Sequence, residues 1–195
     1  SPHHEKATGT LPLSVDKQEE LADATRYFLM GERERHVVPN LLELSGFSER
    51  AKALEARSEE MLSSLAHQVH DRGEQNRKDI VFDAVITTTS TGNLMPGLSY
   101  RLATKLGQRV DSNTAIWDLG NVGCTGSVKA LNLANRLDSS FANILVVSVE
   151  APTTLINLKA ETVDIWQGNC TFGDGAAALW LSFQPNEEGS SLRVD

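Results

Sequence analysis

Apolar residues in the first third of the chain recur at every third or fourth position, which is the spacing of one helix face. The pattern predicts helices over residues 16–30, 39–44 and 49–72. Gly73 is expected to end the longest of them, since glycine commonly terminates helices. The buried stripe of that helix is expected to comprise Leu54, Met61, Leu62, Leu65 and Val69. Residues 1–79 are therefore predicted to form a helical N-terminal segment.

The pattern changes at Ile80, where short continuous apolar runs replace the helical spacing. Runs typical of buried strands occupy residues 81–88, 115–119, 143–150 and 176–183. Two helical patterns lie between the first three runs: one starts at Pro96 and stops at Gly107, and the other has Val128, Leu131, Ala134 and Leu137 on its apolar face.

Strands that alternate with helices predict a layered α/β fold with a mixed, mostly parallel sheet. We assign residues 80–183 to this α/β core and interpret residues 151–169 within it as irregular. The polar residues 184–195 are predicted to form a connector.

Composition narrows the class of protein. The net charge of −8 argues against nucleic acid or an anionic membrane as the main partner, and no apolar run is long enough to cross a bilayer. Two cysteines do not form a disulfide framework in a chain of 195 residues, so we expect a cytoplasmic protein. His67 and His70 have helical spacing without a third ligand nearby, and we predict no metal site.

The main candidate for chemistry is Cys124, in the segment 118–127, where a strand pattern runs through a glycine turn into a helical pattern. The first amides of a helix have no partner within the helix, and the helix dipole adds partial positive charge there. Both effects favour a thiolate, which is the nucleophilic form of cysteine. The alternative is that Cys124 is a small buried apolar residue, as many free cysteines are, and the turn alone leaves both interpretations open.

A second dense motif, Gly173-Asp174-Gly175, leads into the last strand, and we interpret it as part of the architecture. With it, five motifs occur in one order along the chain: Ser90-Thr91-Gly92, Met95-Pro96-Gly97, Gly123-Cys124, Val146-Val147-Ser148-Val149-Glu150 and Phe172-Gly173-Asp174-Gly175-Ala176-Ala177-Ala178. In this order and spacing they resemble the N-terminal half of a thiolase-fold condensing enzyme. The resemblance is closest to the type III polyketide synthases (chalcone and stilbene synthase-like), with 3-oxoacyl-acyl-carrier-protein synthase III as a near relative. It covers residues 80–183 best.

The resemblance implies an acyltransferase in which Cys124 takes an acyl group from a coenzyme A thioester, with its own backbone N–H in the oxyanion hole. A malonyl-CoA-type extender would then lose carbon dioxide and attack the acyl-enzyme. No cofactor is implied, and the acyl donor could be acyl-CoA or an acyl carrier protein. Phe172 matches an aromatic gate beside the cysteine, and Met95 matches a residue that reaches into the partner's cavity across a homodimer. Ser90 and Thr91 match positions in the cavity wall, although core packing is an alternative for all four residues.

Two departures from the family pattern bear on function. Family members often carry a small residue and two glycines after the cysteine, whereas this chain has Thr125-Gly126-Ser127-Val128, which leaves the starter open. The family's catalytic histidine and asparagine come from a C-terminal half, and no histidine follows His70 here. We therefore expect either a longer polypeptide or a half that requires a partner. The alternative function is a non-catalytic subunit that shapes the cavity of an active synthase, while a hydrolase is disfavoured because Val122 replaces the glycine of its nucleophile elbow.

Overall fold

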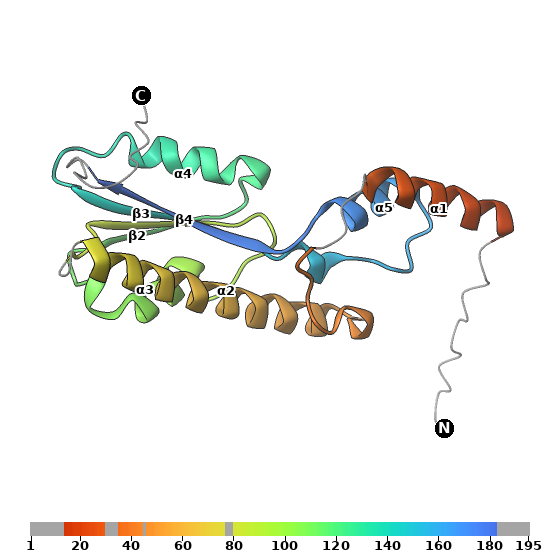
Figure 1. The fold of residues 1–195 in the computed structure, drawn as a ribbon, viewed down its shortest axis with the longest axis horizontal. Helices are drawn as coiled ribbons and strands as arrows, with labels where there is room; N and C mark the ends of the chain where they lie inside the picture. Colours follow the sequence, from red (N-terminus) through yellow and green to blue (C-terminus); the bar gives the residue numbers. More distant parts are fainter. Residues whose placement is uncertain (1–13, 30–34, 45, 77–79, 183–195) are drawn as a thin grey trace, which may run out of the picture. The chain divides into compact units, whose positions relative to one another are not determined.

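The computed structural model describes residues 14–29, 35–44, 46–76 and 80–182 (Figure 1). The chain divides into two compact units, a smaller one of residues 1–35 with 156–172 and a larger one of residues 36–155 with 173–195. Each unit is described by itself. The predicted connector over residues 184–195 lies outside the described residues.

The larger unit is built on a four-stranded sheet with the order β2-β1-β3-β4. Its strands are β1 (Ala84–Thr88), β2 (Ala115–Leu119), β3 (Asn143–Glu150) and β4 (Gly175–Ser182). Strand β1 runs parallel to β2 and β3, and β4 is antiparallel to β3. The prediction of a mixed, mostly parallel sheet is confirmed.

Helices cover both faces of this sheet. Figure 1 shows α2 (Phe47–Asn76) and α3 (Leu98–Leu106) on one face, and α4 (Gly126–Ala134) on the other. Successive residues of a strand point to opposite faces, so β1 contributes Val85 to the core under α2 and α3 and Ile86 to the core under α4. The unit is therefore a three-layered α/β structure with an apolar core on each face of the sheet.

The long helix differs from its prediction at one end. Helix α2 continues through Gly73 to Asn76, so the expected stop was wrong. Gly73 is buried against the guanidinium of Arg109, and a Cβ at this position would lie 2.2 Å from Nη2. The glycine thus permits a close side-chain approach. In contrast, Gly107 does end α3, with a φ of +55° that favours glycine.

In the smaller unit, α1 (Val15–Leu29) confirms the first predicted helix, and α5 (Val163–Thr171) falls in the stretch that we expected to be irregular. Two side chains of α5 bond to the loop before it. Trp166 Nε1 donates to the Ala160 carbonyl at 2.8 Å, and Asn169 Nδ2 donates to the Asn157 carbonyl at 2.8 Å. These contacts explain why a short helix without clear apolar periodicity forms here. Of the other expected elements, residues 39–44 contain only a 3-10 helix, Leu41–Glu43.

Asp174 confirms the architectural interpretation of the glycine motif, because its side chain is fully buried, with 0% exposure. Its carboxylate accepts hydrogen bonds from the Thr153 amide at 3.0 Å, the Thr153 hydroxyl at 2.8 Å and Arg57 Nε at 3.1 Å. Its own amide donates to the His36 carbonyl at 2.9 Å. The aspartate therefore joins α2, the segment after β3 and the start of β4. No helix in the described ranges is long and apolar enough to cross a membrane.

Salt bridges also join helices α2 and α3. The Glu59 carboxylate of α2 lies 2.7 Å from Lys105 Nζ and 2.8 Å from Arg101 Nη1 of α3. The hydrogen bond from Lys105 is the main cause that lowers the pKa of Glu59, and the Arg101 bond adds to it, against partial burial.

This pair predicts an acid-sensitive contribution to stability. Because the pKa of Glu59 is lower in the folded chain than its ordinary value of 4.5, the contribution is present above that value and is lost as pH falls through the folded pKa. Glu59→Gln should therefore lower the melting temperature at neutral pH, and its difference from wild type should shrink below pH 4.5. Glu19→Gln, at an exposed position of α1, is the control for losing one negative charge. A constant difference across the titration would contradict the prediction.

Candidate active site

The carboxyl ends of β1, β2 and β3 meet at one edge of the sheet. Thr88 of β1 lies beside Leu119 of β2 and Ser148 of β3 in the parallel register. In open α/β sheets this edge is where ligands commonly bind. The segments that follow β1 and β2 carry four of the five residues predicted for the site or its walls: Ser90, Thr91, Met95 and Cys124.

Cys124 is exposed and lies in a 3-10 turn, Gly123–Thr125, directly before α4. Two residues just before Cys124 have left-handed backbones: Asn121 with a φ of +57° and Gly123 with a φ of +58°. The Thr125 hydroxyl donates to the Val122 carbonyl at 2.7 Å and helps to close the turn. The thiol is thus accessible to solvent on a 3-10 turn, which disfavours the interpretation of Cys124 as a buried apolar residue.

The start of α4 packs tightly on the sheet. A Cβ at Gly126 would lie 2.1 Å from Thr88 Oγ1, so this position requires glycine. The Ser127 hydroxyl lies 3.3 Å from that of Ser148 and adds a contact to β3. These contacts fix the turn that carries Cys124 relative to two strands.

The predicted face of this helix was partly wrong. Val128 is 69% exposed, and the buried residues are Gly126, Ala130 and Ala134. Small residues four positions apart let the helix backbone approach the sheet closely, and this outweighs the burial of a larger side chain at Val128. Leu131 and Leu137 pack at the margin of the same core.

The segment 89–97, which connects β1 to α3, is held at its start by Glu150 at the end of β3. The carboxylate accepts from the Ser90 amide at 2.8 Å, the Ser90 hydroxyl at 2.9 Å and the Thr91 hydroxyl at 2.7 Å. Ser90 is exposed and Thr91 is buried. Glu150 lies in one of the five motifs, but its role could not be predicted from the sequence, because its three donors follow a different strand.

The end of the same segment is held by Asp118 of β2. Its carboxylate accepts from the Ser99 amide at 3.0 Å and the Ser99 hydroxyl at 2.5 Å, and it is also hydrogen-bonded to the Thr87 hydroxyl. Met95 lies between the two anchors and is 92% exposed. A polar residue at the end of an apolar strand was the available signal for Asp118.

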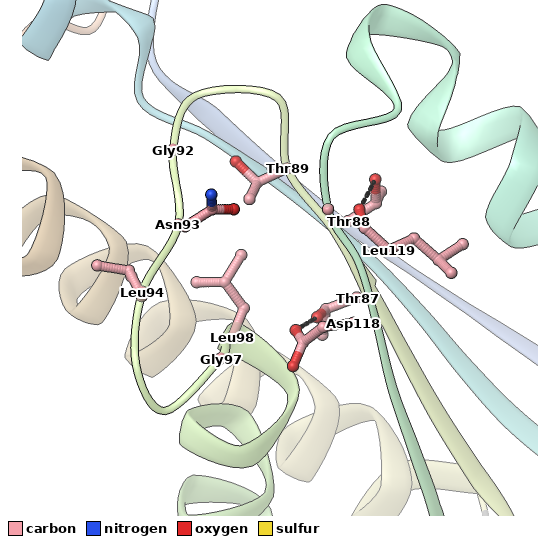
Figure 2. A pocket seen from close by; sticks show the side chains of 11 residues that line it. Thr87, Thr88, Thr89, Gly92, Asn93, Leu94, Gly97, Leu98, Asp118 and Leu119 are labelled. Atoms are coloured by element: carbon pink, nitrogen blue, oxygen red, sulfur yellow. Dashed lines mark hydrogen bonds between the residues drawn. The ribbon is translucent and has the colours of Figure 1, made fainter.

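A small pocket of about 50 Å³ lies between this segment and the ends of β1 and β2. Figure 2 shows the side chains that line it. It is lined by Thr87, Thr88, Thr89, Gly92, Asn93, Leu94, Gly97, Leu98, Asp118, Leu119 and Gly120. Its volume suits water rather than an acyl chain. Among the described residues, no group of three His, Cys, Asp or Glu side chains could hold a metal ion.

Phe172, the predicted gate, belongs to the smaller unit. It follows α5, is 50% exposed, and its carbonyl accepts from Arg35 Nη1 at 3.0 Å. The other four predicted residues follow the neighbouring ends of β1 and β2 in the larger unit. The place of Phe172 beside the cysteine therefore stays a prediction.

Comparison with known proteins supports the same class. Residues 118–194 match the family 3-oxoacyl-[acyl-carrier-protein] synthase III. The chain is 31% identical over 119 residues to an acylalkylpyrone synthase of Aspergillus oryzae, with 56% of this chain and 30% of the relative covered. It is 31% identical over 107 residues to type III polyketide synthase A of Arabidopsis thaliana, with 53% and 26% covered.

Among solved structures, the fold is similar to that of 1,3,6,8-tetrahydroxynaphthalene synthase of Streptomyces coelicolor, a bacterial type III polyketide synthase. The TM-score is 0.71 at 25% identity, with 87% of this chain and 53% of that chain covered. The C-terminal domain of Steely1 of Dictyostelium has the same fold, with a TM-score of 0.75 at 18% identity and coverage of 91% and 50%. The chain is thus similar to type III polyketide synthases in sequence and shares their fold. It spans about half of the solved chains and less than a third of these curated relatives.

The close approach at Gly126 predicts a specific loss of stability. Gly126→Ala should lower the free energy of unfolding by about 1–3 kcal/mol, because the new methyl group overlaps the Thr88 hydroxyl. Urea unfolding measures the change. Gly120→Ala is the matched control in the same turn, since its Cβ would meet only Asn93 Oδ1 at 3.4 Å. Thr88→Ala should partly rescue Gly126→Ala, and equal stability of the two glycine variants would contradict the proposed contact.

Proposed function

We propose that this chain supplies the acyl-accepting part of a decarboxylative condensing enzyme, with Cys124 as the nucleophile. The observation that carries the proposal is the exposed thiol of Cys124 on the turn before α4, within the residues that match the synthase family. The similarity to type III polyketide synthases supports a polyketide or fatty-acyl type of product.

In the first half-reaction, the Cys124 thiolate attacks the carbonyl carbon of an acyl thioester. A carbon–sulfur bond forms to Cys124, the bond to the donor's sulfur breaks, and the donor leaves as a thiolate that takes up a proton. Amides at the start of a helix generally have no partner within it, and the amide of Cys124 would bind the oxyanion. Coenzyme A or an acyl carrier protein could serve as the donor, and no cofactor is required.

In the second half-reaction, a malonyl-type extender loses carbon dioxide, and its carbanion attacks the acyl-Cys124 carbonyl. The new carbon–carbon bond forms as Cys124 leaves as a thiolate. The proposal assigns the histidine and asparagine that assist these steps to a C-terminal half, since no histidine follows His70 in this chain. Positioned acid–base groups contribute about 10²–10⁴-fold to such rates, so this chain alone should accept acyl groups but condense poorly.

The substrate-binding roles complete the proposal. Ser90 and Thr91 would line the cavity from the segment after β1, and Phe172 would act as an aromatic gate. Met95 would reach the partner's cavity in a homodimer, and its 92% exposure in the single chain supports that role. We place this activity in the cytoplasm.

Acylation of one thiol tests the proposal. The full-length protein incubated with an acyl-CoA should gain one acyl mass on Cys124, and Cys124→Ala should lose it together with condensation, by about 10³-fold or more. Cys170→Ala is the matched control and should keep both, because Cys170 is buried in α5. Tandem mass spectrometry of the labelled peptide gives the site.

Three results would contradict the assignment. The label could appear on Cys170, or no label could form with an intact C-terminal half present. Full condensing activity of Cys124→Ala together with a partner synthase would instead assign this chain the role of a non-catalytic, cavity-shaping subunit.

A further inference from the structure

We propose that Asp118 is a positioning residue that fixes the segment carrying Met95 relative to the turn carrying Cys124. The inference rests on the proposed function for the roles of Met95 and Cys124. The supporting observations are contacts at the ends of β1 and β2, all within the larger unit.

The first contact replaces a missing helix cap. Gly97 is the N-cap residue of α3 and has no side chain that could accept a hydrogen bond. Asp118 accepts from the Ser99 amide at 3.0 Å and from the Ser99 hydroxyl at 2.5 Å, and so it caps α3 from a neighbouring strand. A negative charge at the first turn also suits the helix dipole.

The close fit at Gly97 shows how tightly the carboxylate is seated. A Cβ at Gly97 would lie 2.1 Å from Asp118 Oδ2, so a larger residue would displace the carboxylate. The backbone of Gly97 is extended, with a φ of −65°, and would itself accept alanine. The glycine is required here by its contact with Asp118. Met95 lies two residues before this point.

The second contact links Asp118 to the cysteine turn through β1. The Thr87 hydroxyl is hydrogen-bonded to Asp118, and the hydroxyl of the next residue, Thr88, donates to the Leu119 carbonyl at 3.2 Å (Figure 2). The same Thr88 hydroxyl lies against Gly126 at the start of α4. Two successive residues of β1 therefore touch two successive residues of β2, and the second also touches the helix that follows Cys124.

These contacts form one continuous path. It runs from the first turn of α3 through Asp118 and Thr87 to Thr88 and the start of α4. The segment that carries Met95 ends at Gly97, which lies against Asp118. The turn that carries Cys124 lies between Leu119 and Gly126 in the sequence. Loss of the carboxylate should therefore loosen both the segment and the turn, acting through Ser99 on one side and Thr87 on the other.

Two measurements on the full-length protein test this inference, and neither requires condensation. Hydrogen–deuterium exchange of residues 93–103 should become about fivefold or more faster in Asp118→Ala, because α3 loses its cap. The rate of alkylation of Cys124 by iodoacetamide should change by about threefold or more, because a loosened turn no longer holds the exposed thiol in one position. Cys170 serves as the internal reference thiol.

Two further variants sharpen the test. Asp118→Asn keeps an oxygen for the Ser99 amide and should restore most of both values. Gly97→Ala leaves Asp118 in the sequence but displaces its carboxylate, and it should reproduce both effects.

Asp83→Asn is the matched control. Asp83 accepts from the Asn143 amide at 2.7 Å at the opposite ends of β1 and β3. It should change exchange near Asn143 without changing Cys124 alkylation.

Faster exchange in α3 with unchanged Cys124 alkylation would make Asp118 a local helix cap and would overturn the proposal. Unchanged exchange in α3 would overturn it as well. Failure of the proposed function looks different: Cys124 would not accept an acyl group from acyl-CoA, whereas its alkylation would still respond to Asp118.

Discussion

The candidate site depends on the last two residues of β1. Thr87 and Thr88 are both buried, and because strand side chains alternate, they face opposite layers of the unit. Thr87 contacts Asp118 on the side of α3, and Thr88 contacts Gly126 on the side of α4. The end of β1 therefore contacts both the residue that caps α3 and the first residue of α4. The turn with Cys124 and the segment with Met95 adjoin the residues that these two buried hydroxyl groups contact.

The departure from the family pattern after the cysteine can be understood from this arrangement. The close contact of α4 with β1 requires a glycine only at Gly126, which this chain retains. At the next position the chain has Ser127, whose side chain is exposed and whose hydroxyl lies 3.3 Å from that of Ser148. A second glycine there is thus not needed for the packing of the helix. The serine adds a contact between α4 and β3 that a glycine could not make.

The sequence was sufficient for features with local causes. Apolar runs predicted the four strands, because the residues that form each strand stand next to one another in the sequence. Gly107 predicted the end of α3, because a left-handed backbone at one position favours glycine there. Features that depend on distant contacts were missed or wrong. Gly73 does not end α2 because Arg109, far along the chain, packs against it, and α5 forms through hydrogen bonds of Trp166 to the loop before it.

The residues of the candidate site also divide into those with a local signal in the sequence and those that depend on distant contacts. Cys124 could be predicted as a candidate because a cysteine on a strand-to-helix turn has a local physical meaning, and its role stays a prediction. Glu150 and Asp118 could not be given roles, since their donors lie after a different strand and are brought near only by the parallel register. The proposed acylation would use the Cys124 thiol and the amides of one turn, whereas the proposed condensation would also need a proton donor or acceptor near the thioester. Under the proposed function, the two half-reactions are therefore separable, and the exposed thiol on its turn bears on the first of them.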